Sequence, residues 1–148
     1  MFGEDRASLR RVYQTAWTKH QQGRPLEPLE QQIVAVLKEH PEYHATLAAL
    51  GPELDRDYPA EAGAGNPFLH LGLHLAVRDQ IDLDRPPGVR GVFARLATAT
   101  ATAHEAEHLA MEQLSETLRE AQRSGVAPDE HRYLKRLRQL ALRRGRRL

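Results

Sequence analysis

The sequence predicts an all-α fold, a helical bundle of about six to seven helices with a four-helix-bundle-like core. Its apolar residues are mostly Leu, Ala and Val, and Leu and Ala favour helix. Where a periodic pattern occurs, the apolar residues repeat near every 3.6 positions, and no segment carries the signature of a β-hairpin. A chain of 148 residues with 41% hydrophobic residues is long and apolar enough to bury one core.

The first half of the chain is expected to hold three helices. The first covers residues 5–22 and ends at Gly23, which suits the position after a helix end. The second starts near Pro28 and is interrupted by Pro41, because proline disfavours helical geometry in the residue before it. A short helix over 42–50 is then expected, with Pro41 at its first position. A loop follows over 51–66, which is rich in Gly and Pro.

The next helix has a clear predicted start. Asn66 can cap its first turn, and Pro67 suits the first helical position. The helix is expected to continue to about residue 82. The segment DRPPG, residues 84–88, predicts a break.

Three further helices are expected after this break. The first covers about residues 89–97, and the repeat TATATA over 98–103 is interpreted as a bend. The second runs from there to about residue 124, where Gly125 ends it. The last opens near Pro128 and carries a Leu stripe on one face.

The charge of the chain is unevenly distributed. From Arg132 to Leu148 there are eight basic residues and no acidic one, which leaves thirteen basic and twenty acidic residues elsewhere. We therefore expect residues 1–128 to form the bundle and residues 129–148 to form a basic helix and tail of the same domain. This helix can engage nucleic acid phosphates or an acidic protein, dock onto the acidic body of the chain, or simply remain solvated. No aromatic platform or recognised DNA-binding motif accompanies it.

Several classes of chemistry are excluded by composition. The chain has no cysteine, so disulfides, thiolate catalysis and thiolate metal ligands are absent. The opening MFGEDRASLR has no apolar core of a signal peptide, and no stretch of 18 apolar residues occurs. We therefore expect a cytoplasmic protein without a membrane span. No phosphate-binding loop and no nucleophile elbow is present.

Histidine spacing provides the main functional signal. Six of the eight histidines form pairs four residues apart, which are His40/His44, His70/His74 and His104/His108. On a helix such residues lie on one face, one turn apart, and two imidazoles placed so can bind one metal ion. Pro41 interrupts the first pair, so these two residues are expected at a corner of the chain. The two remaining histidines, His20 and His131, are interpreted as surface or hydrogen-bonded residues.

Carboxylates accompany the third pair. In HEAEHLAME, Glu112 continues the face of His104 and His108 by one more turn. Glu105 and Glu107 can instead orient the imidazoles from outside the ligand shell. An ordinary reading of every pair is a set of hydrogen-bonded core or surface histidines.

Several segments resemble a known family. The opening MFG, HPEYH, NPFLHLGLHLAVRDQ, DRPPG, HEAEH and AQRSGVAPDEHRYLKRLR together resemble the bacterial family known as domain of unknown function 1841. The resemblance covers nearly the whole chain, and it implies no activity and no catalytic residues. The TATATA stretch and the tail ALRRGRRL depart from it. There is also a looser similarity to hemerythrin-like and DinB-like bundles, although the order of ligands differs from that of hemerythrin.

These observations lead to one hypothesis and one alternative. The hypothesis is a metal site on facing helices, with His70, His74, His104 and His108 as ligands and His40, His44 and Glu112 as further members. Imidazole and carboxylate ligands suit a transition metal, with iron or zinc favoured. A catalytic site would act on a small-molecule substrate, either as a metal-dependent hydrolase or by oxygen or redox chemistry at iron. The alternative is a non-enzymatic binding module that engages nucleic acid or an acidic protein through its basic C-terminal helix.

Overall fold

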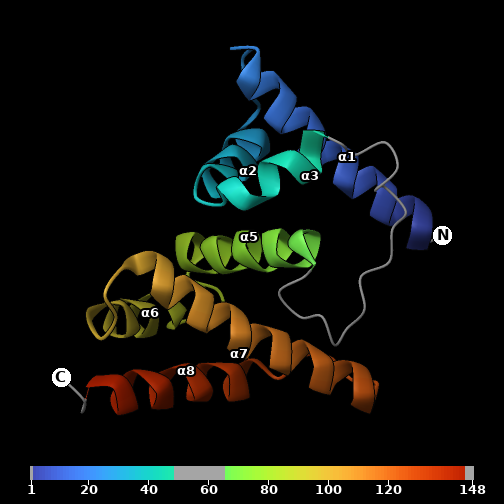
Figure 1. The fold of residues 1–148 in the computed structure, drawn as a ribbon. Coiled ribbons are helices and arrows are strands. Elements are labelled where there is room, and N and C mark those ends of the chain that lie inside the picture. Colours follow the sequence, from blue (N-terminus) through green and yellow to red (C-terminus); the bar gives the residue numbers. More distant parts are fainter. Residues whose placement is uncertain (1, 49–65, 146–148) are drawn as a thin grey trace. The chain divides into compact units, whose positions relative to one another are not determined.

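The computed structural model describes residues 2–48 and 66–145 (Figure 1). These residues form seven α-helices and one 3-10 turn, and they contain no strand, which confirms the predicted all-α class. The chain divides into two compact units, Met1–Leu75 (unit 1) and Ala76–Leu148 (unit 2), which are described separately. Among the described residues, no helix is both long and apolar enough to cross a bilayer. The predicted division at residue 128 stays a prediction.

The first two helices of unit 1 begin and end close to the predicted positions. Helix α1 (Phe2–Gln21) is followed by Gly23, whose φ of 68° lies in the left-handed region that glycine adopts without strain. Helix α2 (Pro28–Lys38) has Pro28 at its first position and a reciprocal cap, in which the Glu30 carboxylate accepts a hydrogen bond from the Glu27 amide at 2.8 Å. The backbone at Glu27 and the ammonium group of Lys19 together lower the pKa of Glu30.

The segment after α2 differs from the single helix predicted over 42–50. Pro41–Tyr43 forms a 3-10 turn, η1, and the short helix α3 (His44–Ala48) follows it. The residue before Pro41, His40, has φ −130° and ψ 66°, which takes the chain out of helical geometry. The Tyr43 amide then donates to the His40 carbonyl, three residues back, at 3.0 Å. The predicted loop over 51–66 lies outside the described residues apart from Asn66.

The core of unit 1 combines residues of four helices. Helices α1 and α2 pack against each other, and α3 packs on α1. On α5, Phe68 and Leu71 belong to the same core, and the Phe68 ring stacks on Tyr13 of α1 with ring centroids 6.4 Å apart. The buried members of this core are Tyr13, Ala16, Trp17, Ile33, Val34, Val36, Leu37, Leu47, Phe68 and Leu71.

Helix α5 (Pro67–Leu83) begins as predicted and extends from unit 1 into unit 2. The side-chain oxygen of Asn66 accepts hydrogen bonds from the amides of Phe68 and Leu69, both at 3.1 Å, so Asn66 is the N-cap. Pro67 occupies the first helical position, where no amide proton is required.

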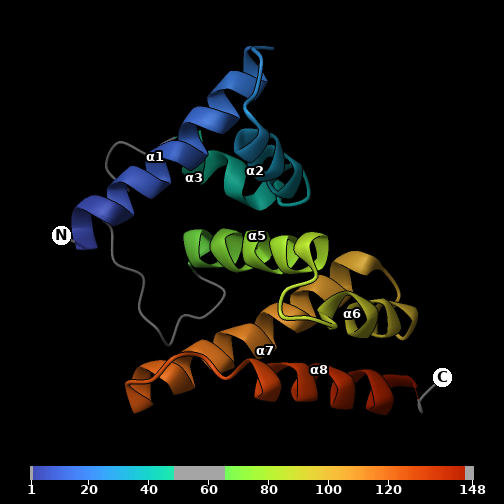
Figure 2. The same cartoon turned by 180° about the vertical axis from the view of Figure 1, so that it is seen from behind.

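Unit 2 contains α6 (Val89–Thr98), α7 (Ala103–Ser124) and α8 (Glu130–Gly145), which pack pairwise (Figures 1 and 2). The predicted break before α6 is present: the Asp84 carboxylate accepts hydrogen bonds from the amides of Gly88 and Arg90, which lowers its pKa. The predicted bend over TATATA is also present, and its Thr102 caps α7. Gly125, with φ 68°, ends α7 as predicted.

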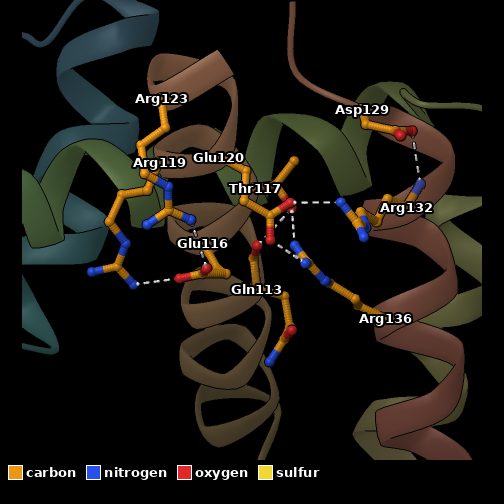
Figure 3. A network of polar contacts seen from close by, with 9 residues as sticks. All are labelled: Gln113, Glu116, Thr117, Arg119, Glu120, Arg123, Asp129, Arg132 and Arg136. Carbon is orange, nitrogen blue, oxygen red and sulfur yellow. Dashed lines mark hydrogen bonds and ion pairs between the residues drawn. The ribbon is translucent and has the colours of Figure 1, made fainter.

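The last helix contributes to the core of unit 2 through one face and binds α7 through another. Its buried residues are Tyr133, Leu134, Leu137 and Ala141. On the polar side, the guanidinium groups of Arg132 and Arg136 both bind the Glu120 carboxylate, and Arg136 also donates to the Thr117 hydroxyl (Figure 3). Part of the basic charge of α8 is therefore neutralised by acidic residues of α7.

Candidate metal centre

Three imidazoles of unit 1 lie together. His70 and His74 are one turn apart on α5, and His40 follows the end of α2. The ring centroid of His40 is 4.6 Å from that of His70 and 5.2 Å from that of His74, and the last two are 5.7 Å apart. Each ring offers a nitrogen that lies within 4.8 Å of those of the other two. Three such nitrogens are a set that can hold a metal ion.

A hydrogen bond to the backbone determines which nitrogen of the His40 ring carries the proton. Its Nδ1 lies 2.7 Å from the carbonyl oxygen of Val36, and because a carbonyl only accepts, Nδ1 carries the proton and donates it. In the neutral ring the lone pair is therefore on Nε2, which lies 2.9 Å from Nε2 of His70. A backbone carbonyl on the remote nitrogen is the usual outer partner of a metal-binding histidine.

The set lies at the edge of an apolar interior. His74 is 0% exposed and His40 is 2% exposed, whereas His70 is half-buried. His74 follows the core residue Leu71 by three positions, so both project from the buried face of α5. The Tyr43 ring stacks on His40 at a centroid distance of 5.3 Å. The pKa of the Tyr43 phenol is raised, mainly because the group is buried. One imidazole is thus reachable from the surface while two are enclosed.

His44 is in neither described group of metal-binding side chains, and its predicted role as a ligand stays a prediction. Its Nε2 donates to the carbonyl of Leu37 at 2.7 Å, and its ring packs against Trp17 with centroids 4.2 Å apart. The 3-10 turn at Pro41–Tyr43 separates the two members of the predicted pair, so their side chains have different neighbours. His20 also packs against Trp17, at 5.1 Å, and His131 is exposed.

Unit 2 carries a second pair of imidazoles. His104 and His108 lie on the first turns of α7 with ring centroids 4.1 Å apart. Between them in sequence, the buried carboxylate of Glu107 accepts two hydrogen bonds from Arg78 of α5, at 3.0 and 3.1 Å. A nitrogen of His104 and a carboxylate oxygen of Glu107 lie within 4.8 Å of each other. The predicted role of Glu107 as a group that orients an imidazole stays a prediction.

The other carboxylates of α7 have different positions. Glu105 accepts a hydrogen bond from the Ala101 amide at 3.0 Å, just before the start of α7. It also forms an ion pair with Arg144 of α8 at 2.9 Å, which links the two helices. Glu112 is exposed and is not in either described group of metal-binding side chains. Its predicted role as a ligand stays a prediction.

Two residues beside these imidazoles were not predicted from the sequence. Arg78 lies four positions after His74, hence on the same face of α5, and this spacing is the one signal that points to it. Tyr43 stacks on His40 because the 3-10 turn brings it there, and helical periodicity does not reveal such a contact. The prediction that His70, His74, His104 and His108 share one ion stays a prediction.

The family model described as Domain of unknown function (DUF1841) matches residues 5–139. A search of curated proteins and a search of solved structures each found no match. The looser similarity to hemerythrin-like and DinB-like bundles stays a prediction.

Proposed function

The chain belongs to the DUF1841 family, whose description assigns no function, and we propose from its own side chains that it binds a transition-metal ion through His40, His70 and His74. The observation that carries this proposal is the approach of three imidazoles from two separate segments of unit 1 to within 4.8 Å. Metal-binding imidazoles need converging lone pairs and fixed ring orientations. Both conditions receive support from the hydrogen bonds and burial of His40.

The spacing of the nitrogens supports one shared ion. Neighbouring nitrogens around an ion with bonds of about 2.0–2.1 Å are roughly 2.9–3.3 Å apart, depending on coordination geometry. The observed separation of the two Nε2 atoms of His40 and His70 is 2.9 Å. In the absence of metal, the same distance is bridged by a proton that His70 donates to His40. Metal binding displaces this proton, and the neutral His70 ring then carries its proton on Nδ1.

Ligand chemistry narrows the identity of the ion. The three imidazoles are neutral nitrogen donors, which suit zinc, iron, copper and nickel and are poor ligands for magnesium or calcium. Zinc and iron remain the favoured candidates, and three histidines with one water are a ligand set used by catalytic zinc. A catalytic site of this kind would either activate water for hydrolysis or, with iron, perform oxygen or redox chemistry. A metal-binding role of His104, His108 and Glu112, which lie on α7, remains a separate proposal.

The main alternative for these imidazoles is purely structural. Three neutral rings can share protons and stabilise the junction of α2 and α5 without any ion, which is how most buried histidines behave. The two readings differ in their response to metal. A ligand that binds only the folded state raises the melting temperature, whereas a proton-sharing network does not respond to zinc.

The test is the thermal stability of untagged protein with zinc and with a chelator. We expect zinc to raise the Tm of the wild type and of His131→Gln, which alters an exposed histidine. His70→Gln should abolish the zinc response, and because His70 is half-buried, this variant keeps the core intact. A wild-type Tm that is identical with zinc and with chelator would contradict the proposal.

A further inference from the structure

Unit 2 contains a pocket between α6 and α8 that the proposed metal site does not use. Its volume is about 420 Å³, which lies in the range of pockets that hold small molecules. Residues of both helices line it, and these are Arg95, Thr98, Ala99, Arg138, Ala141, Leu142 and Gly145. No carboxylate is among the lining residues, although the chain has 20 acidic side chains.

The charge of this pocket is not compensated within the described part of the chain. Among residues 2–48 and 66–145, the guanidinium groups of Arg95 and Arg138 make no hydrogen bond or ion pair. This differs from nearby arginines of α8, since Arg136 binds Glu120 and Arg144 binds Glu105. Two guanidinium groups without carboxylate partners make the pocket electropositive.

The remaining wall of the pocket is apolar. Ala99, which directly follows α6, and Ala141 of α8 are each 9% exposed, so they form the buried base of the pocket, whereas Leu142 is 61% exposed. The Thr98 hydroxyl donates to the Arg95 carbonyl at 2.7 Å, which leaves its oxygen able only to accept. A bound molecule would therefore meet two cationic donors and an aliphatic surface.

We propose that this pocket binds a small organic anion, with a carboxylate or phosphate head group and a short apolar body. Guanidinium groups present paired donors that match the planar oxygens of both head groups. The aliphatic base accounts for the apolar body, because contact with Ala99, Ala141 and Leu142 removes its carbons from water. A nucleic acid fits this pocket less well, since no aromatic side chain lines it to stack against a base.

Calorimetric titration at low ionic strength tests the proposal, with sodium hexanoate and hexyl phosphate as probes of the two head groups. We expect at least one of them to bind in a saturable manner with a Kd of roughly 1 mM. Acetate, inorganic phosphate and hexanol should each bind about tenfold more weakly or not at all, because each lacks one half of the ligand. Whichever of the two probes binds more tightly identifies the head group.

Matched variants locate the binding. Arg95→Gln and Arg138→Gln should each weaken binding about tenfold or more, whereas Arg143→Gln, an exposed arginine of α8 outside the pocket, should leave it unchanged. Both pocket arginines are exposed, so circular dichroism should show unaltered folding. Failure of both probes to bind would overturn the proposal, and so would equal weakening by Arg143→Gln. Binding of a single-stranded oligonucleotide that hexanoate and hexyl phosphate do not displace would also overturn it.

Discussion

The Nε2 atom of His40 lies 2.9 Å from the Nε2 atom of His70, although 30 positions separate the two residues in the sequence. Two lone pairs or two N–H groups cannot face each other at this distance, so one proton or one metal ion must lie between the nitrogens. The carbonyl of Val36 holds the proton of His40 on its other nitrogen. The lone pair of His40 therefore faces His70, and the two rings share either one proton or one cation.

Metal occupancy should depend on pH. Imidazoles bind metal only when neutral, so protons compete with zinc for the ring nitrogens, and we expect the wild type to release zinc progressively as the pH is lowered. Equilibrium dialysis over a pH series, with the zinc in the protein compartment measured, checks this. Retention of zinc at pH 4 would indicate ligands other than imidazoles.

Loss of the cap on α5 should destabilise the chain modestly. Asn66→Ala removes the oxygen that accepts from the amides of Phe68 and Leu69, and we expect a loss of about 1 kcal/mol in the free energy of unfolding. Asn66→Asp keeps an oxygen at this place and should cost much less. Urea denaturation of the two variants provides the comparison, and equal losses would contradict the capping role.

The pair between Arg78 and Glu107 should be strongly coupled. Arg78→Gln leaves a buried carboxylate without its bidentate partner, and we expect a loss of about 2–3 kcal/mol in the free energy of unfolding. The double variant, Arg78→Gln with Glu107→Gln, should lose less free energy of unfolding than the two single variants lose together. Urea denaturation of all four proteins measures this coupling. Additive losses would show that the two side chains act independently.

The contact of α8 with α7 should make stability depend on acidity. The hydrogen bond from Arg136 holds the pKa of Glu120 below its ordinary value of 4.5, so the folded state favours the charged carboxylate. The ion pair of the charged Glu120 carboxylate therefore stabilises the folded state fully above pH 4.5, and this stabilisation is lost as the pH falls through the lowered pKa of Glu120. We therefore expect Glu120→Gln to lower Tm at pH 7, and the difference from wild type to shrink at acidic pH as the carboxylate becomes protonated.

Glu112→Gln, measured with a chelator present so that metal binding does not contribute, provides the control for this experiment, because Glu112 is exposed on the same helix. It should leave Tm unchanged at both pH values. A difference for Glu120→Gln that persists unchanged at low pH would mean that lost packing, not lost charge, causes it.

Local signals in the sequence predict most of the helix ends. Proline at first positions, the Asn66 cap and glycines in the left-handed region act within a few residues, so the sequence displays them directly. The spacing of His70 and His74 likewise predicts their shared face on α5. Pro41 likewise predicts that His40 and His44 lie at a corner of the chain, but the different neighbours of the two rings depend on the 3-10 turn between them.

Contacts between helices could not be predicted from the sequence. The pairing of Arg78 with Glu107, and the pocket between α6 and α8, depend on which helix faces pack together. The ion pairs that neutralise part of the charge of α8 can be predicted only in part from the sequence. Its charge imbalance is visible in the sequence, and docking onto acidic residues of the chain is one of the predicted alternatives, but the choice of Glu120 as partner requires the packing of α7 and α8.

The most direct test of the metal proposal is elemental analysis of protein prepared without a histidine tag and equilibrated with zinc and ferrous iron before removal of unbound ions. We expect about one equivalent of zinc or iron in the wild type and in His131→Gln, and almost none in His70→Gln, because only two of the three imidazoles of the proposed site then remain. Wild-type protein that retains no metal, or His70→Gln protein that retains as much as the wild type, would contradict the assignment of His40, His70 and His74 as a metal site.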